Sequence, residues 1–239
     1  PPVVPRRLVY VVNRRTVVDQ STDVVEKMRE RLLYPDRAEW AEHKRVLGDL
    51  RDRLRRLAAT DDLPLAVSTL RGQLADNGEW RSDPARPAVI LGTVDMIGSR
   101  LLFSGYGCGF KTKPLHAGFL GQDALLVHDE AHLEPAFQDL LVAIRKEQKE
   151  GRTPDRWPLR VMELTATSRE QKTSVGLTAK EKKPPEVLPA RPKRPIHFVW
   201  RRLKATKSLH LHPNEDENKL ADAIADFARD EHRASGQAI

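Results

Sequence analysis

Five short apolar runs, separated by stretches with helical periodicity, constrain most strongly what this chain can fold into. The runs are rich in Val, Leu and Ile, which is typical of strands that are buried on both faces of a sheet. Helical stretches lie between several of them, and strands joined through helices run parallel in one sheet. The sequence therefore predicts an α/β fold, a parallel sheet with helices on both faces, whose strands are residues 7–12, 64–70, 88–93, 124–127 and 159–164.

The expected helices follow from apolar residues that recur every three to four positions. This pattern occurs in residues 17–32, 40–57, 94–103 and 134–149. Residues 104–122 begin with glycines and carry Lys111 and Lys113, so we expect a surface loop there. A nucleic-acid contact is the alternative role for this segment.

Composition excludes several classes of protein but does not identify a binding partner. The chain of 239 residues carries 41 Lys and Arg against 34 Asp and Glu, a formal net charge of +7. This excess fits a polyanion partner, and it also fits a surface with a basic bias. No apolar run has the length of a membrane span, no signal peptide is visible, and the single cysteine excludes an internal disulfide framework. We therefore expect a cytoplasmic protein without a membrane partner.

Two acids and a histidine follow the fourth apolar run, at Asp129, Glu130 and His132. Ligands of open α/β sheets bind outside the carboxyl ends of the strands. Phosphoryl transfer needs a metal ion on the phosphate oxygens and a positioned water, and two adjacent carboxylates can divide these tasks. One alternative is an acidic cap on the next helix. Another is a metal site on His128 and His132, although Glu130 does not have the offset of known zinc motifs.

A second polar group closes the strand that follows. Thr165, Ala166 and Thr167 come directly after residues 159–164, and two hydroxyls there suit a switch that hydrogen-bonds to His132. Basic and hydroxyl residues also follow the first three strands, where they can grip phosphates along a nucleic-acid strand. These candidates are Arg14, Arg15, Thr16, Arg71, Gly72 and Thr93.

The order of these motifs resembles the first RecA-like lobe of a superfamily-two helicase. More closely, it resembles the CRISPR-associated DEAH-box helicase–nuclease of type I systems. The resemblance spans about residues 6–170 and includes Asp-Glu-Ala-His at 129–132 and Thr-Ala-Thr at 165–167. Residues 8–20, 70–72, 92–95 and 99–107 carry the rest of it.

The resemblance implies ATP and Mg²⁺ as cofactors, and 3′-to-5′ movement on single-stranded DNA in CRISPR interference. It also implies recruitment to a DNA-bound Cascade-type effector complex. Asp129 would coordinate Mg²⁺ and Glu130 would polarise the attacking water. His132 with the 165–167 motif would couple hydrolysis to strand movement, and the basic and hydroxyl residues named above would face the nucleic-acid backbone.

The chain departs from the family pattern in three ways. No Gly-x-x-x-x-Gly-Lys-Ser/Thr phosphate loop occurs in it, the second lobe is incomplete, and no nuclease domain is evident. We therefore expect a fragment in which residues 1–170 form an incomplete first lobe, 171–195 a linker and 196–239 the start of a second lobe. We expect no useful ATP hydrolysis by this chain alone. The alternative is a RecA-like module that binds nucleic acid or a partner without ATP turnover.

Overall fold

The computed structural model describes residues 4–60, 63–71, 77–151, 157–165, 175–176, 200–202, 204–206 and 219–235. The chain divides into two units, residues 1–174 and 175–239. The predicted linker at 171–195 lies outside the described residues except for positions 175 and 176. In the second unit the structure describes helix α8 (Leu220–Ser235), which overlaps residues 215–232, where acids near the start and apolar residues on one face predict a helix.

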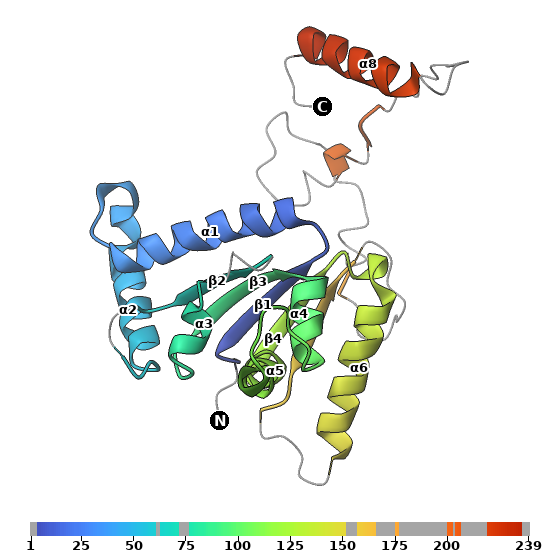
Figure 1. The fold of residues 1–239 in the computed structure, drawn as a ribbon. Coiled ribbons are helices and arrows are strands. Elements are labelled where there is room, and N and C mark those ends of the chain that lie inside the picture. Colours follow the sequence, from blue (N-terminus) through green and yellow to red (C-terminus); the bar gives the residue numbers. More distant parts are fainter. Residues whose placement is uncertain are drawn as a thin grey trace. The chain divides into compact units, whose positions relative to one another are not determined.

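The first unit is built on one five-stranded sheet (Figure 1). Its strands stand in the order β2-β3-β1-β4-β5, and all four pairings between neighbours are parallel. The predicted α/β class and parallel sheet are therefore confirmed. The strands are β1 (Arg7–Val12), β2 (Ala66–Leu70), β3 (Ala88–Thr93), β4 (Ala124–Asp129) and β5 (Arg160–Leu164).

Helices cover both faces of this sheet, as predicted (Figure 1). Successive side chains of β1 point to opposite faces. Val9 and Val11 join a core cluster with residues of α4 (Val94–Leu101), α5 (Lys113–Gly121) and α6 (Pro135–Glu150). Tyr10 and Val12 instead pack with residues of α1 (Arg15–Leu33). Burial on both sides explains why the strand sequences are continuously apolar.

Both ends of the helix predicted over residues 40–57 differ from the structure. Residues 38–43 form a 3₁₀ helix, η1 (Ala38–His43), and the α-helix α2 (Lys44–Arg55) starts only afterwards. Trp40 has non-helical angles of −137° and 29°, and its indole N–H donates to the Tyr34 carbonyl at 2.8 Å. This contact interrupts the helix that periodicity alone predicts. None of the described helices has the length and apolar character to cross a membrane.

The prediction of a loop over residues 104–122 was wrong in its second half. A 3₁₀ turn, η2 (Phe110–Thr112), leads directly into α5. Pro114 suits the first turn of that helix, and Ala117, Phe119 and Leu120 are buried. The prediction failed because the glycines at the start of the segment indicated a loop, although an apolar helical face follows them.

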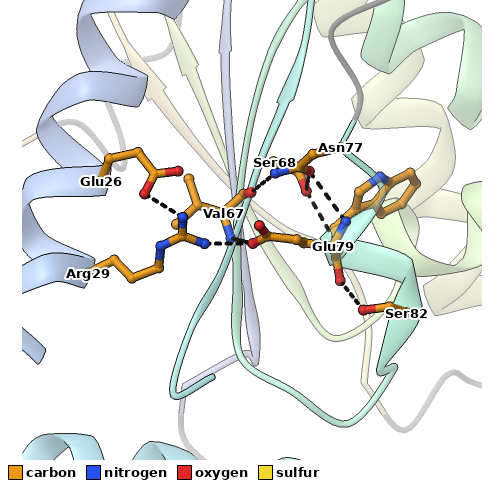
Figure 2. Close-up of polar contacts among 8 residues, drawn as sticks. Glu26, Arg29, Val67, Ser68, Asn77, Glu79 and Ser82 are labelled. Carbon is orange, nitrogen blue, oxygen red and sulfur yellow. Dashed lines mark hydrogen bonds and ion pairs between the residues drawn. The ribbon is translucent and has the colours of Figure 1, made fainter. Parts of the chain in front are cut away.

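Side chains close the outer edge of strand β2 (Figure 2). The short helix α3 (Glu79–Ser82) and Asn77, two residues before it, lie along this edge. The Val67 N–H donates to the Glu79 carboxylate at 3.1 Å, and the Asn77 amide donates to the Val67 carbonyl at 2.8 Å. The Glu79 carboxylate also pairs with Arg29 of α1 at 2.7 Å. These side chains occupy backbone groups that a further strand would otherwise use.

Candidate functional site

Polar residues gather where the parallel strands end. The register sets Asp129 of β4 opposite Leu164 of β5, and Val12 of β1 opposite Thr93 of β3. The residues after these strands therefore lie along a single edge of the sheet. Strand β4 runs two residues further than predicted, because His128 and Asp129 still pair with β5. Asp129 is thus the last residue of the strand, on a rigid element.

Two hydrogen bonds orient the Asp129 carboxylate. The Tyr10 hydroxyl of β1 donates to Oδ2 at 2.5 Å, and the Glu130 backbone N–H donates to Oδ1 at 2.9 Å. Burial, and then the hydrogen bond to Asp129, raise the pKa of Tyr10 to about 12. Tyr10 therefore stays protonated and remains a donor to this carboxylate at neutral pH.

Glu130 turns the chain away from the strand. Its backbone is left-handed, with φ 52° and ψ 40°, which is uncommon for a residue other than glycine. The turn leads into the 3₁₀ helix η3 (Ala131–Leu133) and leaves the Glu130 side chain 59% exposed. Strained backbone of this kind clusters at functional sites, where it aims a side chain.

His132 links the acidic turn to the end of β5. Its Nδ1 lies 3.2 Å from the Thr165 hydroxyl and 3.5 Å from a carboxylate oxygen of Glu130. The sequence-based hypothesis that Thr165 and His132 meet therefore agrees with the geometry. Ala166 and Thr167, the rest of that motif, lie outside the described residues.

His128 and His132 have different surroundings. His128 is fully buried, its ring packs edge-to-face on Phe137 with centroids 5.0 Å apart, and burial lowers its pKa. Neither of its ring nitrogens has a hydrogen-bond partner. The alternative of a metal site on these two histidines is therefore not supported, because His128 faces the core and His132 contacts Thr165.

The candidate nucleic-acid residues are dispersed along the same edge. Arg14, Arg15 and Thr16 are exposed at the start of α1, and Arg71 is exposed but paired with Asp19 of that helix. Thr93 is only 7% exposed, so its hydroxyl is less available to a ligand than the sequence implied. Gly72 lies outside the described residues.

The acidic pair suits Mg²⁺ held together with phosphate oxygens and water, because that ion usually takes only one or two carboxylates from a protein. Each Asp129 oxygen accepts one hydrogen bond and keeps a second lone pair for a metal or its water. Within the described ranges, no group of three or more His, Cys, Asp and Glu residues lies close enough to hold a metal ion by itself.

Tyr10 is the site residue that the sequence pattern did not predict. The available signal was a hydroxyl-bearing ring in an otherwise aliphatic strand, two residues before its carboxyl end. Its partner, Asp129, lies 119 residues away along the chain, so only the sheet order reveals the contact.

Comparisons with known proteins found no matching family model, no matching curated protein and no matching solved structure.

Proposed function

We propose that the first unit is a RecA-like lobe that binds a nucleotide with Mg²⁺ and single-stranded DNA. The observation that carries the proposal is the cluster of Asp129, Glu130, His132 and Thr165, brought to one edge of a parallel sheet. Such an edge is where α/β proteins bind nucleotides, and the motif order supplies the helicase assignment. We further propose, from the resemblance alone, an ATP-dependent 3′-to-5′ helicase of CRISPR interference with a Cascade-type complex as its partner.

Each residue of the cluster has a distinct task in this proposal. Asp129, oriented by Tyr10, would hold Mg²⁺, and the ion would supply charge neutralisation on the phosphate oxygens. Glu130, on its strained turn, would orient the attacking water and accept its proton. His132, which contacts both Glu130 and Thr165, would couple changes at the nucleotide to the end of β5.

A titration of the full chain with a fluorescent ATP analogue tests the nucleotide site. We expect Mg²⁺-dependent binding that falls at least about tenfold in Asp129→Asn, since a lost charge-assisted contact costs roughly 1.5 to 3 kcal/mol. Asp139→Asn, which removes the same charge from an exposed position of α6, is the matched control and should bind like the parent.

Three results would separate the alternatives. Nucleotide binding without Mg²⁺ dependence, or equal loss in both variants, would contradict the assignment of Asp129. Binding of single-stranded DNA with no nucleotide binding at all would favour the module without ATP turnover. Rapid DNA-stimulated phosphate release by this chain would contradict the expectation that it is inactive alone.

A further inference from the structure

Three exposed aromatic rings lie within eight residues of one another between α4 and α5. Phe103 is 59% exposed, Tyr106 56% and Phe110 89%. Among the described residues, only two other Phe or Tyr side chains are at least 45% exposed, Tyr34 and Phe227. Rings left in water at this density are typical of a binding surface, because burial would otherwise stabilise the fold.

Phe103 occupies a backbone position that favours glycine. Helix α4 ends in a Schellman motif, in which the Phe103 N–H donates to the Arg100 carbonyl at 3.1 Å and the Ser104 N–H to the Ser99 carbonyl at 2.8 Å. The residue after the helix cap must then be left-handed, and Phe103 has a φ of 57°. A bulky ring there is strained, and its exposure means that packing does not compensate for the strain.

Side-chain contacts hold the segment that carries the rings in place. The Cys108 sulfur lies 3.2 Å from Nδ1 of His116, which is 1% exposed. Gly105 is so closely packed that an added Cβ would approach Arg100 and Cys108 to 2.9 Å. The rings are therefore presented by an ordered loop, which lowers the entropic cost of binding a ligand.

The segment that carries the rings has basic residues and no acidic ones. No Asp or Glu occurs between Asp95 and Asp123, whereas Lys111 and Lys113 lie beside Phe110. Aromatic rings next to cations match a ligand with flat unstacked groups and negative charge. The bases of duplex DNA are already stacked, so the ligand that fits is a single strand.

We propose that Phe103, Tyr106 and Phe110 form a stacking surface for the bases of single-stranded nucleic acid, with Lys111 and Lys113 on its phosphates. The surface follows α4, whose eight residues run back from the strand-end edge over about 12 Å (Figure 1). It is thus a second contact for the nucleic acid, separate from the residues at the carboxyl ends of the β-strands. This contact does not depend on nucleotide binding.

Fluorescence anisotropy with labelled oligo(dT), and with an abasic strand of the same length, tests the stacking. We expect the parent chain to bind oligo(dT) much more tightly than the abasic strand. Phe110→Leu and Tyr106→Leu keep apolar area but cannot stack, and each should weaken oligo(dT) binding about fivefold or more. Tyr34→Leu removes a comparably exposed ring from the end of α1 and is the control, with unchanged affinity.

The salt dependence separates the lysines from the rings. The ring variants should keep the slope of log K against log salt concentration, while Lys111→Gln with Lys113→Gln should reduce it by about 1.4. Oligo(dT) binding is measured without nucleotide or Mg²⁺, so a failure of the nucleotide site is distinguishable from a failure of this surface.

Phe103→Gly gives the sharpest result, because it should raise the melting temperature while it weakens binding to oligo(dT). Equal binding of abasic and base-bearing strands would overturn the proposal. Leucine variants that bind oligo(dT) like the parent would also overturn it and would point to a protein partner, for which the neighbouring exposed Leu102 and Leu115 are suited.

Discussion

At the scale of single residues, the environment of each group decides its chemistry more than its type does. Tyr10 and His128 both lie near Asp129, yet one donates a hydrogen bond to it and the other is buried without a partner. Burial disfavours the charged form of both, so the pKa of Tyr10 is raised and that of His128 is lowered. Each shift predicts a measurable dependence on pH.

Tyr10→Phe should remove one high-pH ionisation. The protein has three tyrosines, and Tyr10 ionises with a pKa of about 12 rather than near its usual 10. The folded state binds this proton more tightly than the unfolded state, so its contribution is present below pH 10 and is lost as pH rises toward 12. Absorbance of tyrosinate between pH 9 and 13 should show the late step in the parent only. If the step that disappears in the variant instead has its midpoint near pH 10, the Tyr10–Asp129 contact is contradicted.

His128→Val should stabilise the protein. The imidazole is 0% exposed and neither nitrogen is hydrogen-bonded, so an apolar side chain removes a desolvation cost of about 1 to 3 kcal/mol. Its folded pKa is lowered, so the parent loses stability as pH falls below about 6.5, where the unfolded state gains the proton. Urea unfolding at pH 5.5 and 7.5 measures both effects. The gain of the variant should be larger at pH 5.5, and a loss at both values would refute the assignment.

At the scale of elements, the two edges of the sheet are finished differently. Strand β2 has its outer backbone groups occupied by the side chains of Asn77 and Glu79 (Figure 2). Strand β5, at the opposite edge, has mostly exposed side chains, with Met162 at 51%. A covered edge resists pairing with other chains, and here side chains provide the cover.

Asn77→Ala should destabilise the first unit through this edge. It removes the donor to the Val67 carbonyl and the acceptor of the Ser68 hydroxyl, bonds of 2.8 and 2.6 Å, and the expected cost is about 1 to 3 kcal/mol. Ser82→Ala, which removes one exposed bond to the Glu79 carbonyl, is the matched control and should change stability by less than about 0.5 kcal/mol. Urea unfolding of both variants measures the difference. Equal losses of stability would contradict the prediction that the Asn77 contacts contribute more to stability than the exposed Ser82 bond.

At the scale of the whole molecule, the hydrophobic core belongs to the first unit. All members of the two described core clusters lie between Val9 and Val161. Chain contacts place the boundary between the units at residues 174 and 175. The fold of the first unit should therefore be encoded by its own residues.

A chain that ends at Ser174 should unfold at the same temperature as the full chain, within about 2 °C. The reason is that truncation removes none of the described core residues. Scanning calorimetry of both chains is the measurement, with circular dichroism to confirm that the shorter chain is folded. A fall in melting temperature of about 5 °C or more would mean that residues after 174 stabilise the first unit.

The sequence by itself determined the class of the fold and most of its elements. Continuous apolar runs identified the strands, and helical periodicity identified α1, α4 and α6, because these patterns are local consequences of burial on a sheet face. The acids at 129 and 130 were found for the same reason, since they directly follow a buried run. The helix at 113–121 was missed, because glycines in the preceding residues outweighed its short apolar face.

Only the tertiary structure decided which residues meet. The sheet order brings Tyr10 to Asp129 and Thr165 to His132, pairs that lie 119 and 33 residues apart in the chain. It also decided that His128 points into the core and that Phe103 is left-handed and exposed. Pairing partners and backbone handedness depend on packing between distant segments, and neither periodicity nor composition carries that information.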